Sequence, residues 1–480
     1  MVAGGRVLSV ASEAVPLVKT GGLADVAGAL PAALLAQGWA MRVLLPAYPG
    51  LAAKLAGGEE VWSAQELFGG PARVLKGAAG GVTFLLLDAP HLYARAGGPY
   101  GAGGVDYPDN PERFAALSWV AAEIARGGAA DGWVPDILHA HDWQAGLAPA
   151  YLRYGPETPV RTVLTIHNIA FQGLAPAGKL DALRLPGWAF SAEQLEYYGN
   201  ISTLKAGLVT ADALTTVSPT YAEELMRPEF GMGLEGVIAA RAGDLHGILN
   251  GVDLAVWSPE SAPAITSYSA RNLRAKAANR AALAAEFGLT PAAGPLAIVV
   301  SRLTDQKGID LLVAVLPDFI AAGGSLAALG AGDPALEGAL RAAAERWPGR
   351  VGVHIGYDEA LAHRMFGGGD AVLVPSRFEP CGLTQMYGLR YGTVPVVAAT
   401  GGLNDTVIGA TPASLAARAA TGITFHPVDR TGLAGALRRL GVLYRDRTGW
   451  TALMKRAMKA EVGWAAPAAR YAALYRSLMR

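Results

Sequence analysis

The segment PLAIVVSRLTDQKGIDLLVAVLPDFI, residues 295–320, contains the pattern that decides the fold. It begins with a continuous apolar run of the kind that forms a strand buried on both faces. A short polar loop follows, and apolar residues then recur at helical spacing from Ile309 to Ile320. A buried strand followed directly by an amphipathic helix predicts one unit of a parallel sheet that helices cover on both faces.

The same alternation extends through both halves of the chain. Apolar strand candidates in the first half lie at 6–11, 41–46, 81–88, 135–143 and 160–168. In the second half, strands and helical stretches alternate more regularly, from residue 295 to about 400. We therefore predict an α/β protein with two Rossmann-like, doubly wound domains.

The predicted boundary between the domains lies near HGILNGVDLAVWSP, residues 246–259, where turn residues cluster. The first domain is expected to cover about residues 1–248, and the second about 249–455. The last stretch, 456–480, is expected to contain a helix that packs back onto the first domain.

The composition favours a globular protein and argues against several other classes. Hydrophobic residues make up 52% and charged residues 17% of the 480 residues. Lysine plus arginine and aspartate plus glutamate both number 40, so we expect neither nucleic-acid binding nor a polybasic membrane anchor. The first residues read as a strand and not as a signal peptide, and Cys381 is the one cysteine. These features favour a cytoplasmic protein without disulfides or a membrane span.

The loop Lys19-Thr20-Gly21-Gly22 follows the first predicted strand and precedes a predicted helix. Free N–H groups in such a loop, together with a helix N-terminus, favour a bound anion. The carboxyl end of a strand is also where open α/β sheets bind ligands. The sequence has no P-loop motif and no complete G-x-G-x-x-G after this strand. Pro31 is expected to bend or shorten the helix that follows.

A second loop at a strand end, SRLTDQKG, contains Arg302 and Lys307. Arginine can grip a phosphate with two hydrogen bonds, and lysine adds a mobile charge. Together with Lys19, these residues supply three cations from the two predicted domains. We expect these three cations to bind one diphosphate, held in a cleft between the two predicted domains.

A third strand end, SRFEPCGLTQ, contains Glu379, whose carboxylate is poorly suited to a core. The residues Gly382-Leu383-Thr384 begin another helix and so offer a second N-terminus that favours an anion. Cys381 is expected to be a buried packing residue and not a nucleophile.

The motifs HAHDW (139–143) and IHN (166–168) end two other predicted strands. Histidines there invite a zinc site, but neither a partner pattern nor H-E-x-x-H accompanies them. We expect His167 and Asp142 to hydrogen-bond sugar hydroxyls and His139 to be structural. The sequence contains no D-x-D motif, so we expect no metal-bridged diphosphate. We also expect no other metal and no cofactor.

Taken together, these motifs resemble those of the bacterial glycogen synthases. The resemblance runs from about residue 6 to 478 and rests on KTGGLADVAGALP, HAHDWQAGLAPAYL, TIHNIAFQG, SRLTDQKGID and PSRFEPCGLTQMYGLRYGTVPVV. These are ADP-glucose-dependent, retaining glucosyltransferases related to plant starch synthases. The resemblance implies a GT-B fold, with the active site in the cleft between two Rossmann-like domains. It also implies ADP-glucose as donor and an α-1,4-glucan such as glycogen as acceptor. Gln144 departs from the histidine that many members carry after HDW, which bears on the acceptor surface.

The resemblance implies roles for individual residues. The residues expected to act around the reacting glucose and the leaving diphosphate are Asp142, His167, Arg302, Lys307 and Glu379. The residues expected to contact the donor are Lys19, Gly21, Gly22, Asp25, Asn250, Tyr357, Gly382, Leu383 and Thr384. Tyr100 and Trp143 are expected to contact the acceptor.

Two mechanisms would retain the anomeric configuration. In same-face attack, the departing phosphate oxygen takes the acceptor's proton and no enzyme nucleophile is needed. In double displacement, Glu379 or Asp142 would form a covalent intermediate. Three other functions stay open at this point: a GT-B-type glucan phosphorylase, a sugar-nucleotide epimerase and a non-catalytic glucan-binding protein.

Overall fold

The computed structural model describes residues 4–480, so residues 1–3 of the first predicted domain lie outside the described part. The chain forms two compact units. The first contains the chain up to Gly251 together with Trp464–Arg480, and the second is Val252–Gly463. Both predicted boundaries fall a few residues before the observed ones. The second differs more, because helix α18 (Arg447–Ala457) crosses the predicted boundary and packs on α17 and β19 of the second unit.

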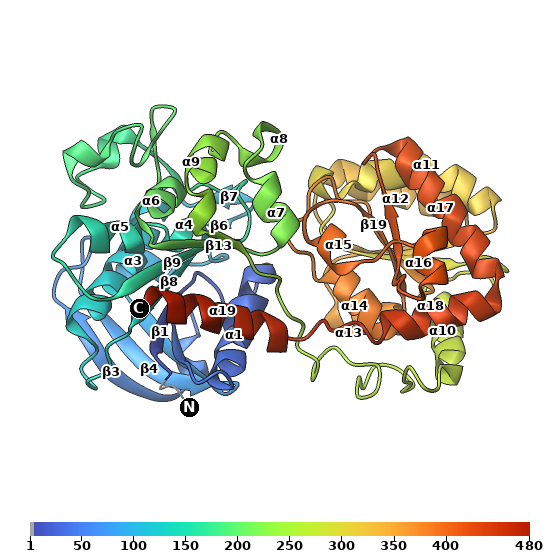
Figure 1. Cartoon of the computed structure of the whole chain (residues 1–480), viewed down its shortest axis with the longest axis horizontal. Coiled ribbons are helices and arrows are strands. Elements are labelled where there is room, and N and C mark those ends of the chain that lie inside the picture. Colours follow the sequence, from blue (N-terminus) through green and yellow to red (C-terminus); the bar gives the residue numbers. More distant parts are fainter. Residues whose placement is uncertain (1–3) are drawn as a thin grey trace. The chain divides into compact units, whose positions relative to one another are not determined.

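The core of the first unit is a nine-stranded sheet with the order β14-β13-β9-β8-β1-β2-β5-β4-β3 (Figure 1). Its strands are β1 (Arg6–Val10), β2 (Ala40–Pro46), β3 (Ala56–Ala64), β4 (Ala72–Ala79), β5 (Val82–Asp88), β8 (Ile137–His141), β9 (Arg161–Ile166), β13 (Ala213–Thr216) and β14 (Leu245–Gly247). The strands from β14 to β5 are parallel, as predicted. Strands β4 and β3 continue the edge in antiparallel pairing. The sequence analysis missed both, because β3 is largely exposed and neither strand is a continuous apolar run.

Helices cover both faces of this sheet (Figure 1). The helices of the first unit are α1 (Gly22–Leu35), α2 (Pro90–Tyr93), α3 (Asn110–Gly127), α4 (Asp142–Ala145), α5 (Leu147–Tyr154), α6 (Thr203–Thr210), α7 (Pro219–Glu224), α8 (Pro228–Gly231), α9 (Glu235–Ala240) and α19 (Ala465–Leu478). Two small sheets lie outside the main one: β6 (Gly101–Ala102) with β7 (Val105–Asp106), and β12 (Asn200–Ser202) between β10 (Leu174–Pro176) and β11 (Glu196–Tyr197).

Helices α1 and α19 lie side by side on one face of the sheet (Figure 1). Helix α1 continues through Pro31 to its end at Leu35, so the predicted shortening is wrong. Leu30 and Leu34 are fully buried in the cluster that α19 joins, and this burial holds the turn after the proline in place. Tyr475 of α19 packs edge-to-face on Trp39, with ring centroids 5.1 Å apart.

The second unit contains a six-stranded parallel sheet with the order β17-β16-β15-β18-β19-β20. Its strands are β15 (Leu296–Val300), β16 (Ser325–Gly330), β17 (Val351–Ile355), β18 (Ala371–Val374), β19 (Val394–Ala398) and β20 (Ile423–Phe425). Numbered from one to six along the chain, they follow the order 3-2-1-4-5-6 of dinucleotide-binding folds. The predicted alternation is therefore confirmed in this half of the chain.

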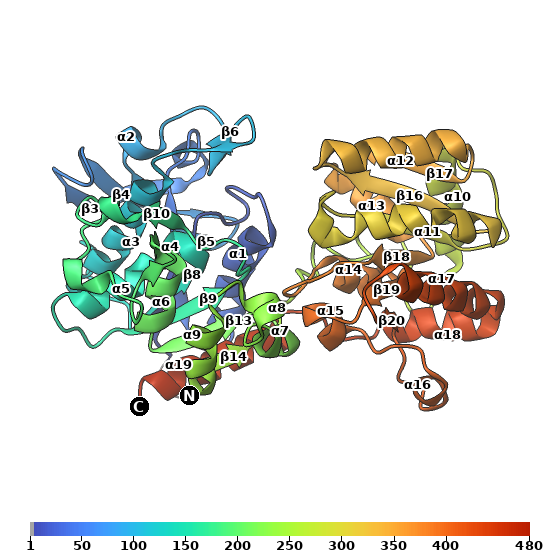
Figure 2. The same cartoon turned by 90° about the horizontal axis from the view of Figure 1, so that it is seen from above.

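Two groups of helices sandwich the second sheet (Figures 1 and 2). The group containing α11, α12 and α17 lies on one face, and the group containing α10, α13, α14 and α18 lies on the other. The bounds are α10 (Arg274–Glu286), α11 (Ile309–Ala321), α12 (Pro334–Arg346), α13 (Glu359–Gly368), α14 (Thr384–Tyr391), α15 (Gly401–Thr406), α16 (Pro412–Ala416) and α17 (Arg430–Arg445). None of the helices within residues 4–480 combines the length and apolar character needed to cross a lipid bilayer.

The parallel part of each sheet has one place where the strand order reverses. It lies between β1 and β8 in the first unit and between β15 and β18 in the second. Chain connections leave such a pair in opposite directions, so the carboxyl ends of the two strands stay uncovered and form the usual ligand site. The loops after β1 and β8 carry Lys19 and Asp142, and those after β15 and β18 carry Lys307 and Glu379. The fold thus brings most of the predicted residues of each unit to its own switch point.

Candidate functional site

A buried carboxylate organises the loop after β1. Glu13 is 3% exposed, and its side chain accepts hydrogen bonds from the backbone N–H groups of Thr20 and Gly21. The prediction that the N–H groups of this loop are free is therefore wrong for these two residues. Burial raises the pKa of Glu13, and the hydrogen bonds to the loop oppose that rise. An internal acceptor thus fixes the conformation of the predicted anion-binding loop.

Lys19 and Asp25 lie together at the start of α1. Their side chains form an ion pair, with Nζ of Lys19 2.8 Å from Oδ1 of Asp25. Because 31% and 25% of the two side chains are exposed, the pair contributes only about 0–1 kcal/mol to stability. Lys19 can therefore exchange this carboxylate for a phosphate at little cost.

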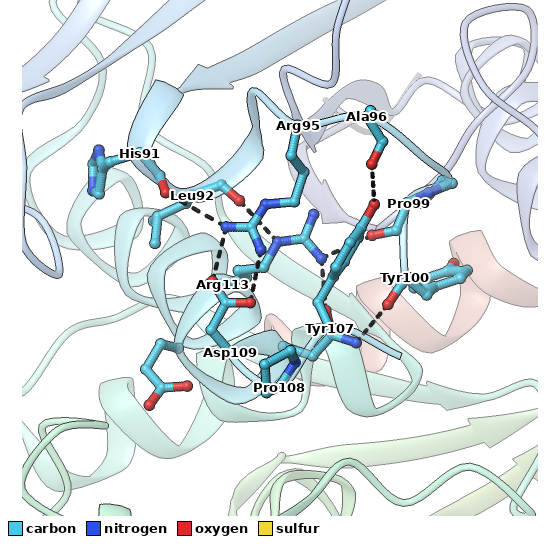
Figure 3. Close-up of polar contacts among 12 residues, drawn as sticks. His91, Leu92, Arg95, Ala96, Pro99, Tyr100, Tyr107, Pro108, Asp109 and Arg113 are labelled. Carbon is cyan, nitrogen blue, oxygen red and sulfur yellow. Dashed lines mark hydrogen bonds and ion pairs between the residues drawn. The ribbon is translucent and has the colours of Figure 1, made fainter. Parts of the chain in front are cut away.

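Tyr100 belongs to a loop whose backbone is hydrogen-bonded to the fully buried side chain of Arg113 (Figure 3). The guanidinium of Arg113 donates to the carbonyl oxygen of Pro99 at 2.9 Å. An ion pair with 2.8 Å bonds joins Arg95 to Asp109 across the same loop. Burial lowers the pKa of Arg113, whose N–H groups donate to the carbonyl oxygens of Leu92 and Pro99. This network fixes the backbone of the loop and thereby the position of Tyr100.

The hydroxyl of Tyr100 is hydrogen-bonded to Ser12 Oγ at 2.8 Å, in the loop that follows β1. Burial raises the pKa of Tyr100, and the nearby carboxylates of Glu13 and Asp142 add to the rise. Tyr100 therefore lies within electrostatic range of both acids at this switch point. Because the hydroxyl of Tyr100 is already hydrogen-bonded to Ser12, the face of its aromatic ring is the part that can contact a ligand.

Asp142 is the most unusual residue of the site. Its φ of +54° lies in the left-handed region, which non-glycine residues seldom adopt. Oδ1 accepts hydrogen bonds from the backbone N–H groups of His167 at 2.6 Å and Asn168 at 3.3 Å. Burial raises the pKa of Asp142 to about 7, against the opposing effect of these bonds. A strained backbone and a perturbed carboxyl together are typical of a functional residue.

His167 lies beside Asp142 and is linked to two buried polar residues. Its Nε2 is 2.9 Å from Nδ1 of His141, and Nε2 of His141 is 3.1 Å from Ser9 Oγ. Burial lowers the pKa of both imidazoles, to about 3 for His141, so both rings are neutral at physiological pH.

His139 has only structural partners, in line with its predicted role. It is fully buried between Tyr475 Oη at 2.7 Å and Thr165 Oγ1 at 2.6 Å. It therefore connects helix α19 to the sheet.

Trp143 lines a groove of about 820 Å³ in the first unit. The walls combine aromatic and aliphatic side chains with a few polar groups; they include Tyr107, Asn110, Phe171, Gln172, Leu174 and Tyr197. Gly173, with φ +62°, lets the chain pass close to Trp143, where an added Cβ would lie 2.5 Å from the indole ring. Phe171 is 53% exposed, so an apolar surface faces this groove.

In the second unit an ion pair joins the loops after β15 and β18. Nζ of Lys307 lies 2.5 Å from Oε2 of Glu379, and the Ser376 hydroxyl donates to the same oxygen at 2.9 Å. Only 15% of the lysine and 9% of the glutamate side chain are exposed. The close approach of the loops requires Gly308, which has φ +64° and whose added Cβ would lie 2.1 Å from the carbonyl oxygen of Pro375.

Arg377 ties the same two loops together a second time. Its guanidinium makes a two-bonded ion pair with Asp310, at 2.8 and 2.7 Å, and its backbone N–H donates to the carbonyl oxygen of Gln306. Arg302 is different. Its side chain is exposed, and within residues 4–480 it has neither an ion pair nor a hydrogen bond. A bare guanidinium at a strand end is well suited to bind an anion.

Helix α14 begins directly after this cluster, at Thr384. Among the residues that the structure describes, no side chain caps its N-terminus, where Leu383 is the capping residue. Gly382 has φ +73°, a backbone conformation that other residues seldom adopt, and an added Cβ would lie 2.4 Å from the side-chain amide of Gln385. That side chain in turn donates to the carbonyl oxygen of Gly382 at 2.9 Å. The loop is thus fixed while the helix N-terminus has no side-chain acceptor, as an anion site requires.

Asn250 and Tyr357 follow edge strands and lie away from the switch points of their units. Asn250 is 7% exposed, and its Oδ1 has no hydrogen-bond partner within residues 4–480. Tyr357 is 79% exposed, and its hydroxyl donates to Glu359 Oε2 at 2.8 Å. Asn250 therefore offers a buried acceptor, and Tyr357 offers an exposed aromatic face.

The sequence analysis missed three residues that organise the site. Glu13 and Arg377 each carry a charge just after a buried strand. The same criterion predicted Glu379, so it could have identified these two residues as well. Arg113 gave no local signal, because two of its acceptors, the carbonyl oxygens of Leu92 and Pro99, lie 21 and 14 positions earlier in the chain. Cys381, predicted to be a packing residue, is buried.

Comparisons with known proteins identify one family, and its members match nearly the whole chain. Residues 6–240 match the family model of the starch synthase catalytic domain. A glycogen synthase from Cereibacter sphaeroides (strain ATCC 17025 / ATH 2.4.3) is 66% identical over 475 residues, 99% of each chain. The glycogen synthase from Paracoccus denitrificans (strain Pd 1222) is 59% identical over 474 residues, 98% of this chain and 99% of that protein. These relatives support the main prediction and none of its three alternatives.

The solved structures agree with the fold. The catalytic domain of Starch Synthase IV from Arabidopsis thaliana bound to ADP and acarbose has a TM-score of 0.89 at 29% identity, covering 99% of this chain and 100% of that chain. Sucrose-phosphate synthase from Thermosynechococcus elongatus, at 20% identity over 99% of each chain, has a TM-score of 0.61 and shares the fold alone. The predicted GT-B architecture of two Rossmann-like domains is confirmed.

Proposed function

Since this chain belongs to the bacterial glycogen synthase family and is a glycosyltransferase, we propose that it transfers glucose from ADP-glucose to the non-reducing end of an α-1,4-glucan with retention of configuration. The observation that carries the proposal is the gathering of the matched charged residues at the two switch points, two in the loops of each unit. We also propose that the protein acts in the cytoplasm and needs neither a metal nor a cofactor.

The residues of the second unit are proposed to stabilise the leaving diphosphate. Transfer develops negative charge on the ADP oxygen and positive charge on the anomeric carbon. Arg302, Lys307 and the backbone at 382–384 would face the diphosphate, where fixed donors act most strongly in the transition state. The exposed ring of Tyr357 is suited to stack on the nucleobase. Release of Lys307 from Glu379 would free the carboxylate to accept a hydrogen bond from a glucose hydroxyl.

The residues of the first unit are proposed to bind the transferred glucose and the donor. His167 and the unpartnered Oδ1 of Asn250 are suited to sugar hydroxyls, since a buried acceptor without a partner is unfavourable. Asp142, when ionised, would stabilise the positive charge at the anomeric carbon. Lys19 and the N-terminus of α1, with Asp25, would add a contact to the donor. In same-face attack the acceptor's proton passes to the departing phosphate oxygen as the new glycosidic bond forms.

Lys19→Ala is expected to raise the KM for ADP-glucose about tenfold and to change kcat by less than about threefold. The reason is that Lys19 is partly exposed and forms an ion pair with Asp25, so we expect it to contribute mainly to donor binding. Initial rates at saturating glucan, over a range of ADP-glucose concentrations, provide the measurement. A large fall in kcat at unchanged KM would instead assign Lys19 to the transition state.

The groove beside Trp143 is proposed to hold the glucan acceptor. Phe171→Ala removes an exposed ring from this groove, so the KM for a maltooligosaccharide primer is expected to rise about fivefold while the KM for ADP-glucose stays the same. Trp188→Ala is the matched control, because Trp188 is 61% exposed but does not line the groove. Equal effects of the two substitutions on primer KM would contradict the assignment.

The proposed function is tested by supplying labelled ADP-glucose and UDP-glucose side by side, with glycogen as primer. Label from ADP-glucose should enter the glucan in α-1,4 linkage, faster than label from UDP-glucose and at the same rate with a metal chelator present. Incubation of the same protein with glucose 1-phosphate separates the phosphorylase alternative. Absence of incorporation from either nucleotide sugar would sink the proposal.

A further inference from the structure

His141 and His167, at the ends of β8 and β9, form with Ser9 a short chain of hydrogen bonds that ends at the candidate glucose site. It runs from Ser9 Oγ to His141, 3.1 Å, and from His141 Nδ1 to His167 Nε2, 2.9 Å. Ser9 and His141 are both fully buried, whereas His167 is partly exposed. The chain therefore leads from the core of the first sheet to an accessible imidazole.

A neutral imidazole carries one N–H, so only two proton arrangements satisfy both bonds. In the first, the Ser9 hydroxyl donates to His141 Nε2, His141 Nδ1–H donates to His167 Nε2, and His167 carries its proton on Nδ1. In the second, every bond is reversed, so that His167 Nε2–H donates inward and its Nδ1 is a bare acceptor.

The surroundings of Ser9 distinguish the two arrangements. In the reversed chain the Ser9 hydroxyl would accept from His141, and its own proton would need another acceptor. Within residues 4–480 the Ser9 hydroxyl is hydrogen-bonded to His141 alone, and the residue is 0% exposed. A buried hydroxyl proton without an acceptor is unfavourable by about 1–3 kcal/mol, which strongly favours the first arrangement.

We infer that Ser9 and His141 are positioning residues that fix His167 as the Nδ1–H tautomer, so that it presents a hydrogen-bond donor to a sugar hydroxyl oxygen. The donor direction requires neutral rings, and burial lowers the pKa of His139, His141 and His167 alike. Nδ1 of His167 has no hydrogen-bond partner within residues 4–480, so its proton is available to a ligand. The sugar part of this inference rests on the proposed function, whereas the tautomer does not.

The parallel chain through His139 provides a matched control. His139 also lies on β8, and its ring centroid is 4.3 Å from that of His141. One of its ring nitrogens is hydrogen-bonded to the buried hydroxyl of Tyr475, as one nitrogen of His141 is to that of Ser9. It makes no bond to His167. Ser9→Ala and Tyr475→Phe each remove one hydroxyl from one of two neighbouring histidines, and only the first belongs to the chain that reaches the site.

The test is the ¹⁵N NMR spectrum of the full-length protein labelled in its histidines, with the His167 signals assigned from their loss in His167→Gln. Wild-type His167 should show a protonated Nδ1 and an unprotonated Nε2, as should the Tyr475→Phe variant. Ser9→Ala should populate both tautomers and lower kcat about two- to threefold, and Ser9→Thr, which restores a hydroxyl, should return both readouts toward wild type. A wild-type His167 protonated at Nε2, or a single unchanged tautomer in Ser9→Ala, overturns the inference. The spectrum needs no substrate, so it can succeed or fail independently of the glucosyl-transfer assay.

Discussion

Replacing Asp142 with asparagine is expected to lower kcat by roughly a hundred- to a thousandfold, because the carboxylate that would stabilise the positive charge at the anomeric carbon is lost. The variant should still fold. Asparagine tolerates the φ of +54° better than other side chains do, and its carbonyl oxygen can accept the N–H groups of His167 and Asn168. The wild-type rate should rise with pH through about 7 as Asp142 ionises, and the variant should lack that rise.

The same substitution is expected to stabilise the protein. Burial raises the pKa of Asp142 from an ordinary value of 3.8 to about 7 in the folded state. Between those values the folded protein holds a proton that the unfolded chain has released. The contribution of this group to the free energy of unfolding therefore falls as pH rises from about 4 to 7 and stays low above 7. Asparagine does not ionise, so near pH 8 it should raise the stability by about 2 kcal/mol, seen as a higher Tm.

Asp212→Asn is the control for both measurements. Asp212 also accepts a backbone N–H, from Thr162 at 2.7 Å, but it lies at the amino end of the sheet of the first unit. It should leave kcat and the pH profile unchanged. An Asp142→Asn variant that keeps more than about a tenth of the wild-type rate would exclude the carboxylate from the role proposed for it.

Replacing Lys307 with methionine is expected to lower kcat roughly a hundredfold and to destabilise the second unit by about 3 kcal/mol. The loss of rate follows from the missing cation at the leaving diphosphate. The loss of stability has a separate cause. Without Lys307, Glu379 would be a buried carboxylate that no longer has a cation beside it and keeps the hydrogen bond from Ser376. Steady-state rates and thermal unfolding measure the two effects on the same sample.

The double variant Lys307→Met, Glu379→Gln separates these causes. Because both charges of the buried pair are removed, its Tm should return toward wild type while kcat stays low. Arg364→Met is the control, since the Arg364–Glu286 pair is more exposed, at 33% and 38%, and should change neither readout. If rate and Tm recover together in the double variant, the lysine acts through structure and not through charge at the donor.

Much of the architecture is readable along the chain because it depends on local patterns. The apolar run at 296–300 and the stripe from Ile309 form β15 and α11, since burial of a strand and of one helix face follows from the spacing of neighbouring side chains. Polar residues placed just after buried strands mark the ligand end of a parallel sheet, and this criterion predicts Lys19, Asp142 and Glu379 as site residues. The antiparallel edge of β3 and β4 has no such pattern, because one of its faces is solvated.

The partners of the site residues could not be obtained in this way. The sequence alone determined that this is a chain of two parallel α/β domains with charged residues at its strand ends. Only the tertiary structure decided that Glu13 holds the loop after β1, that Lys307 pairs with Glu379 across 72 positions, and that Ser9 meets His141 across 132. The physical reason is that strand order and register set which loops meet, and these depend on burying the whole sheet at once and not on any local segment.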